Sequence, residues 1–64
     1  MKPLFRVGDE DPLIAEAQRR LLCPVEDGVF SDDLAARVRG FQWVHGLAVH
    51  GHLDQQTIDQ LRGE

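Results

Sequence analysis

Apolar residues recur at helical spacing in the first third of the chain. When successive residues are placed about 100° apart, four of them fall within one arc of about 100°: Leu13, Ile14, Ala17 and Leu21. Asp11 is a suitable N-cap, and Pro12 suits the first helical position because the N–H that proline lacks would be unsatisfied there. We therefore predict a first helix that begins at Pro12 and is stopped by Pro24.

Two further capped segments follow. Ser31 is a good N-cap for a second helix, and the two aspartates after it place negative charge at the positive end of the helix dipole. This helix is expected to run to about His45 and to end at Gly46 in the left-handed conformation. Asp54 caps a short third helix. The expected buried positions are Leu34, Val38 and Phe41 in the second helix and Thr57, Ile58 and Leu61 in the third.

The loops before the second and third helices repeat one pattern. Each contains an apolar residue, a glycine turn, a second apolar residue and a helix cap: Val25, Gly28, Phe30 and Ser31, then Val49, Gly51, Leu53 and Asp54. No long segment alternates as a strand would, so the chain is predicted to be all-α, a small three-helix bundle with two loop-helix half-repeats. The residues expected to share one core are Leu21, Phe30, Val38, Phe41, Leu47, Leu53, Ile58 and Leu61.

Length and charge narrow the classes of function. The 64 residues allow one domain, residues 1–64 with a core over about 7–61, and a chain this short buries only about 60% of its unfolded surface. The single cysteine, Cys23, excludes an intramolecular disulfide. The net charge of -4 and the absence of a basic run argue against nucleic-acid binding. No apolar run approaches the roughly 18 residues of a membrane span, so a membrane is not an expected partner either.

The residues that could carry chemistry have simpler explanations. His45, His50 and His52 lack the converging ligands that a zinc site needs, so no metal or other cofactor is expected. The carboxylates of residues 9–11 and 32–33 sit in an exposed leader or in the first turn of a helix, where capping explains them better than acid-base catalysis. We therefore predict that the chain is not an enzyme.

Trp43 is the residue that core packing explains least. On the second helix it points about 180° away from Leu34. Arg39 lies on the same side as Trp43, and exposed aromatic residues beside arginine commonly anchor binding surfaces. Trp43 either covers the apolar edge of the domain or forms a binding surface with Arg39. On the second interpretation, Arg39 and Trp43 are the predicted ligand- or partner-binding residues.

The sequence resembles that of a known protein family. Gly8-Asp9 before a helix, Ala17-Gln18, Leu21-Leu22, Asp27-Gly28-Val29-Phe30, Val38, Phe41-Gln42, His45-Gly46-Leu47, Val49, Gly51, Thr57 and Leu61 look like the helical peptidoglycan-binding domain of bacterial and phage cell-wall enzymes. The order and spacing of these elements match from about residue 7 to residue 61. The chain departs from the family pattern at Ala17, Ser31-Asp32, Leu34, His50 and Asp54-Gln55.

The resemblance implies a non-catalytic module that recognises cell-wall peptidoglycan. The alternative is a phage virion component, a capsid or tail decoration protein that uses the same fold to dock on another protein. Either role would gain from the display of many copies. The first 11 residues lack the apolar stretch of a secretory signal, so we expect synthesis in the cytoplasm, with delivery to the wall or to a virion depending on something else.

Overall fold

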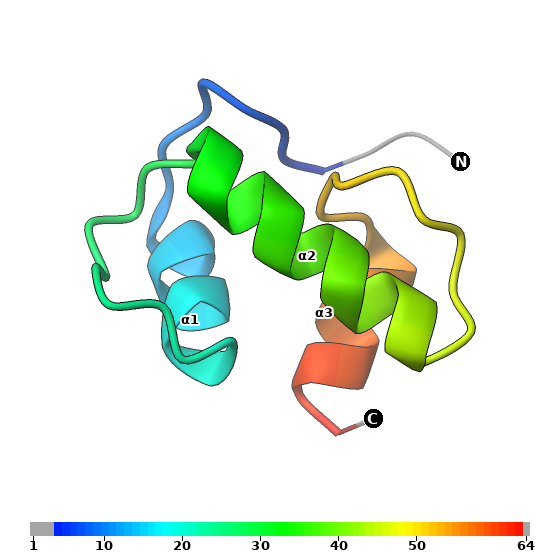
Figure 1. Ribbon diagram of the computed structural model, residues 1–64. Helices are drawn as coiled ribbons and strands as arrows, with labels where there is room; N and C mark the ends of the chain where they lie inside the picture. The colour runs from blue at the N-terminus through cyan, green and yellow to red at the C-terminus, as the bar shows by residue number, and fades with distance from the viewer. Residues whose placement is uncertain (1–3, 64) are drawn as a thin grey trace.

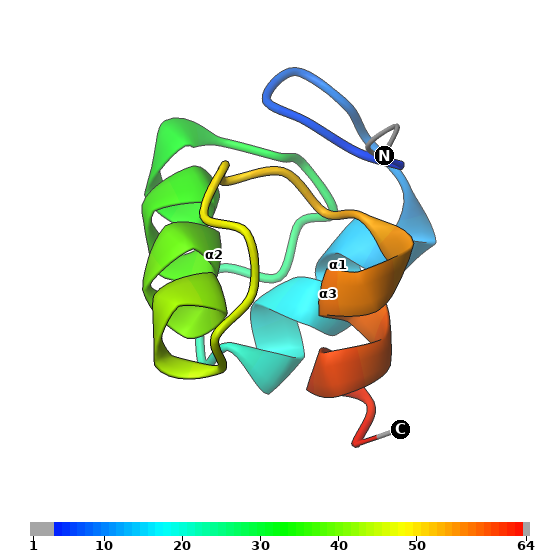
Figure 2. The same cartoon turned by 90° about the vertical axis from the view of Figure 1, so that its right-hand side faces the viewer.

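The computed structural model describes residues 4–63 and contains three helices joined by two long loops (Figure 1). Helix α1 spans Pro12–Arg20, α2 spans Asp32–Val44 and α3 spans Gln55–Leu61. Seen from the side, α2 and its following loop form one half of the molecule, while α1 and α3 lie together in the other half (Figure 2). The predicted all-α three-helix architecture is confirmed.

All three predicted N-caps are present. The side chain of Asp11 accepts a hydrogen bond from the Leu13 N–H at 2.9 Å, and Ser31 accepts one from Leu34 at 3.3 Å. Asp54 accepts the Thr57 N–H at 2.8 Å. Each bond satisfies an amide that the first turn of a helix leaves without a backbone partner, so local sequence sets where each helix begins.

The first two helices end in the same hydrogen-bonded motif. At the end of α2 the Leu47 N–H donates to the Gln42 carbonyl, and Gly46 adopts the predicted positive φ of 71°. At the end of α1 the Cys23 N–H donates to the Gln18 carbonyl in the same way, but Leu22 holds the left-handed position, with φ 58°. The expectation that Pro24 stops α1 is therefore wrong, because this motif at Leu22 ends the helix first.

The core combines residues from all three helices and both loops. Its buried apolar members are Ile14, Ala17, Phe30, Leu34, Ala35, Val38, Leu53 and Ile58. Four predicted core residues are thus confirmed, and Leu21 and Leu61 pack against the cluster from its edge. Phe41 and Leu47 were wrongly predicted as core residues, because both are only partly buried and lie outside the cluster. Helix α2 is turned so that Gln42 faces inward in place of Phe41.

Two buried glutamines hold the two loops. The Gln18 side-chain oxygen accepts the Gly28 N–H at 2.9 Å, and its amide nitrogen donates to the Asp27 carboxylate and the Val29 carbonyl. Gln42, with no exposed surface, binds the second loop in the same manner. Its side-chain oxygen accepts the His50 and Gly51 N–H groups, and its amide nitrogen donates to the His52 carbonyl and the Thr57 hydroxyl. The half-repeat predicted from the loops therefore also includes a buried glutamine in the helix that precedes each loop.

In the second loop, His50 has the role that Asp27 has in the first loop. In the first loop Asp27 accepts the N–H of the residue two places on, and in the second loop the Nδ1 atom of His50 accepts the His52 N–H at 3.0 Å. Because Nδ1 is an acceptor, the proton of the neutral ring lies on Nε2, which is 3.0 Å from the Asp54 carboxylate. His50 thus has a structural role in the loop.

The N-terminal segment, residues 4–11, runs past the ends of both loops and pairs with each of them (Figure 1). Phe5 forms an antiparallel bridge with Leu53, and Glu10 forms one with Val29. Phe5 also packs against the core cluster, so the packed unit begins before the predicted boundary at residue 7. This segment ties the two half-repeats together.

The capping and loop aspartates predict a loss of stability in acid. Burial alone would raise the pKa of Asp54, but hydrogen bonds from Thr57 and His50 outweigh it and lower the pKa of that carboxyl. A hydrogen bond from Gln18, followed by one from the Val29 N–H, lowers the pKa of Asp27. Since both folded-state pKa values lie below the unfolded value of about 3.9, their contribution is present above that pH and is lost as pH falls through the folded values.

We therefore expect the melting temperature to hold between about pH 7 and pH 5 and to fall below about pH 4. Thermal unfolding followed by circular dichroism across this range measures it. Asp27→Asn keeps an acceptor oxygen but cannot titrate, so its melting temperature should depend less steeply on pH. A melting temperature that rises on acidification would contradict this explanation.

Candidate functional site

The outer face of α2 carries the two residues predicted to bind a partner. Trp43 is 76% exposed, the largest apolar side chain left in solvent among the described residues. Arg39 lies one turn earlier on the same side of the helix and is also exposed. The Arg39 side chain lies against the second loop, because a Cβ built at Gly51 would be 3.1 Å from its Cγ atom. The structure therefore leaves the Trp43 ring accessible on the same side of α2 as Arg39.

A groove of about 460 Å³ lies next to this face, between the end of α1 and α2. We call it the α1–α2 groove. Its lining residues are Arg20, Leu21, Leu22, Arg37, Gly40, Phe41, Val44 and His45. Leu22 and Val44 are 84% and 72% exposed, and the Phe41 ring packs at a tilt against the His45 ring, with centroids 4.2 Å apart. The groove combines apolar walls with basic side chains, and none of its lining residues is acidic.

Leu22 is held in an unfavourable conformation at the edge of the groove. A non-glycine residue in the left-handed region costs roughly 1–2 kcal/mol, which is why glycine usually takes this position at the end of a helix. Gly46 does so at the equivalent point of α2. Leu22 instead combines a φ of 58° with a side chain that is almost fully in solvent, so its own packing does not offset the strain.

Gly40 forms an open stretch of backbone in the groove. It lies in the middle of α2, where glycine is less favourable than alanine by about 1 kcal/mol. A Cβ at this position would meet nothing within 4 Å, so packing inside the domain does not require a glycine. Without a side chain here, an external group can approach the helix backbone closely.

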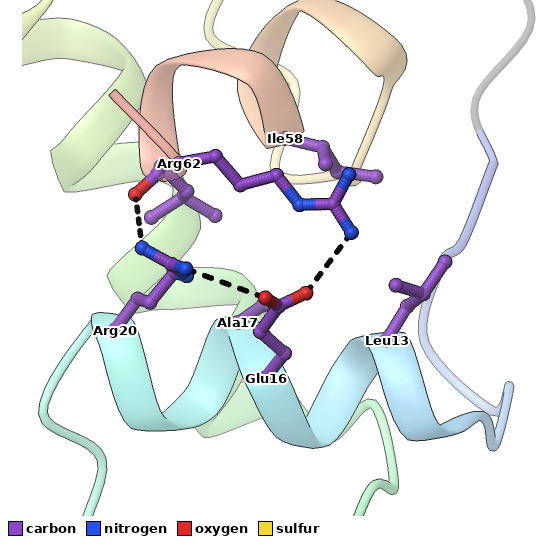
Figure 3. A pocket seen from close by; sticks show the side chains of 7 residues that line it. Leu13, Glu16, Ala17, Arg20, Ile58 and Arg62 are labelled. Carbon is purple, nitrogen blue, oxygen red and sulfur yellow. Dashed lines mark hydrogen bonds and ion pairs between the residues drawn. The ribbon is translucent and has the colours of Figure 1, made fainter. Parts of the chain in front are cut away.

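A much smaller depression between α1 and α3 has a structural role (Figure 3). Its volume of about 10 Å³ holds one water at most. Glu16 bonds to Arg62 at 3.1 Å and to Arg20 at 3.4 Å, and Arg20 also donates to the Leu61 carbonyl. The hydrogen bond from Arg62, assisted by both positive charges, holds the pKa of the Glu16 carboxyl below its usual value. These bonds fasten α3 to α1.

Neither a cluster of metal-ligating side chains nor an activated thiol is present among the described residues. Within residues 4–63, no group of three or more His, Cys, Asp or Glu is placed to hold a metal ion. Burial, with smaller opposing and reinforcing effects from nearby charges, raises the pKa of the Cys23 thiol, so the thiol is kept protonated and is a poor nucleophile. In the described part of the chain, no helix is long and apolar enough to cross a membrane.

Comparison with known proteins identifies the family. The family model described as "Putative peptidoglycan binding domain" matches residues 10–61, most of the chain. This chain belongs to that family. No curated protein sequence matches significantly. A similar solved structure is that of a fused Zn-dependent amidase/peptidase/peptidoglycan-binding domain-containing protein from Clostridium acetobutylicum, with a TM-score of 0.85 and 29% identity.

The alignment with the Clostridium protein covers 94% of this chain but only 29% of that protein. The likeness therefore concerns one module of a longer protein. The predicted family and fold of the peptidoglycan-binding domain are thus confirmed.

The residues of the candidate binding site could be predicted only in part from the sequence. Arg39 and Trp43 share the expected exposed face, and their role in binding stays a prediction. Leu22, Gly40 and Val44, which build the adjacent groove, were not singled out as site residues. A glycine in the middle of a helical pattern and a leucine pair before Pro24 were the available sequence signals, but only the packing of α1 beside α2 joins them.

Proposed function

We propose that this domain is a non-catalytic module that binds bacterial peptidoglycan through the outer face of α2. The observation that carries the proposal is the exposure of Trp43 in a chain that belongs to the peptidoglycan-binding family. An indole ring supplies a large, rigid surface with little conformational entropy to lose, which suits stacking against the apolar face of an amino sugar. Arg39 beside it supplies hydrogen-bond donors for the polar edge of the same sugar.

Several arrangements support a binding role without catalysis. Asp11 and Asp54 are committed to helix caps, Glu16 to an interhelical contact, and Asp27 to a loop turn. The Cys23 thiol is kept protonated. We propose that the domain holds an attached or associated partner at the wall, as the composition of the Clostridium protein suggests for its own module.

Co-sedimentation with purified sacculi tests this function. The chain is expected to pellet with the sacculi without releasing soluble fragments, and Trp43→Ala is expected to weaken binding by about 1 to 2 kcal/mol, or roughly 5- to 30-fold. Val25→Ala is a matched control, since Val25 is an exposed apolar residue of the first loop. Equal binding by Trp43→Ala and the original chain would remove Trp43 from the site.

The alternative role in a virion would use the same face for another purpose. In that case sacculus binding is absent, and the Trp43 surface is buried against a second protein in the assembled particle. We favour peptidoglycan because the family match supports it directly. Display of several modules on one particle or enzyme would strengthen the attachment in either case.

A further inference from the structure

We infer that the α1–α2 groove binds the acidic peptide of peptidoglycan, while Trp43 contacts the glycan. This inference rests on the proposed function and deepens it by dividing the ligand between two neighbouring surfaces. Peptidoglycan joins largely uncharged amino-sugar strands to short peptides that carry methyl groups and free carboxylates. The two surfaces of the domain differ correspondingly, because the groove is lined by arginines and apolar side chains while the outer face of α2 carries the Trp43 ring.

The charges of the groove favour an anion. The whole chain has a net charge of -4, yet the groove is lined by Arg20 and Arg37 and by no carboxylate. Arginine offers hydrogen-bond donors in a planar fork that can bind a carboxylate with two bonds at once. A basic cleft in an acidic protein also concentrates anionic ligands locally.

Arg37 is the groove arginine that is available for exchange. It contacts Asp33 at 3.3 Å in a partly exposed pair on one helix. Such pairs contribute little to stability, so a ligand carboxylate can take over the guanidinium at small cost. Arg20 stays bonded to Glu16 and to the Leu61 carbonyl and adds a second positive charge at the edge of the groove. The carbonyls of Gln18 and Arg19 at the end of α1 already accept N–H groups of Cys23 and Leu22, which leaves Arg37 as the main exchangeable polar group there.

The shape of the groove favours a peptide with small side chains. The groove has a volume of about 460 Å³ and is shallow and open to solvent, so it suits an extended chain laid across it better than an enclosed small molecule. Leu22 and Val44 form apolar walls, and the bare backbone at Gly40 leaves space between them. Leu22 and Gly40 each break a local rule of helix structure, and two such violations in one groove are typical of a functional surface.

The groove and the outer face are continuous. At about 100° per residue, Gly40 lies between Trp43 and Val44 around α2, so no intervening side chain separates the ring from the groove. A sugar stacked on Trp43 therefore has its attached peptide directed across Gly40 toward Leu22 and Arg37. This juxtaposition assigns the peptide to the groove.

The test compares intact sacculi with glycan strands from which an amidase has removed the peptides. The chain should bind intact sacculi, and binding to stripped strands should be weaker by about tenfold or more. Gly40→Leu fills the groove where space is open, and Arg37→Glu reverses its charge, so each should weaken binding to intact sacculi by about tenfold. Arg19→Glu, an equal charge change at an exposed α1 residue outside the groove, should bind as the original chain does.

Leu22→Gly separates binding from folding. Glycine relieves the left-handed strain, so the melting temperature should hold or rise while binding to intact sacculi falls. The inference is wrong if Gly40→Leu and Leu22→Gly fold and bind intact sacculi at the original level, or if stripped strands bind as well as intact sacculi. In either case the groove does not bind the peptide, but the proposed binding of the domain to peptidoglycan is unaffected. If intact sacculi are not bound at all, the proposed function fails together with this inference.

Discussion

Phe30→Ala is expected to unfold the domain. Phe30 is the largest fully buried side chain of the described residues, with 1% of its surface exposed, and it joins the first loop to the core. Truncation of a buried phenylalanine costs about 3 to 5 kcal/mol, close to the entire free energy of unfolding of a domain this small. Loss of the helical circular dichroism signal at 25 °C, or a collapse of the urea midpoint, is the expected observation.

Phe41→Ala provides the matched comparison. The same substitution at a half-buried ring outside the core cluster should cost clearly less and leave a folded protein. A reversed order, with Phe41→Ala unfolded and Phe30→Ala folded, would show that α2 is turned differently from the arrangement described above.

Gln42→Leu is expected to destabilise the domain by about 2 to 4 kcal/mol although it conserves side-chain volume. The substitution removes four hydrogen-bonding partners at once, and among them the Gly51 N–H and the Thr57 hydroxyl are buried. A buried polar group left without a partner costs about 1–3 kcal/mol. Urea unfolding measures the loss, and hydrogen exchange of the Gly51 amide should accelerate even where the variant remains folded.

Gln56→Leu controls for the chemical change itself. Gln56 is an exposed residue of α3, so its replacement should change the free energy of unfolding by less than about 0.5 kcal/mol. If Gln42→Leu were as stable as Gln56→Leu, the buried glutamine would not be what holds the second loop.

The parts of the fold that depend on neighbouring residues could be predicted from the sequence. Asp11, Ser31 and Asp54 were identified as caps because capping involves only the next two or three residues. Gly46 was identified because glycine is favoured in the left-handed position. Leu22 takes the same position at the end of α1 without any such sequence preference, so its conformation could not be predicted.

The inward face of α2 was harder to predict because apolar character misleads there. Phe41 and Gln42 are adjacent, and hydrophobicity alone places the phenylalanine inside. The buried amide of Gln42 instead satisfies the backbone of a loop whose position depends on tertiary structure. The two glutamines stand ten and nine residues before their bound glycines, a spacing that becomes meaningful only once the half-repeat is known in three dimensions.

In the candidate site, too, the features set by one helix could be predicted and those set by packing between helices could not. The helical spacing of Trp43 and Arg39 indicated a shared face of one helix, which requires only the geometry of that helix. The groove needs the end of α1 to lie beside the middle of α2, and no local pattern specifies that packing. Its exposed Leu22 and Val44 also look like ordinary apolar residues until their surroundings are known.

Peptidoglycan binding through α2 is tested most directly by an NMR titration of the isotopically labelled chain with soluble peptidoglycan fragments that contain both sugar and peptide. Binding through the proposed surface should shift the backbone amides of Gly40 and Val44, the Trp43 indole N–H and the amide of Leu22, and should leave Gln56 on α3 unchanged. Fragments that produce no shifts, or shifts confined to α3 and the N-terminal segment, would contradict the proposal that this domain binds peptidoglycan through α2.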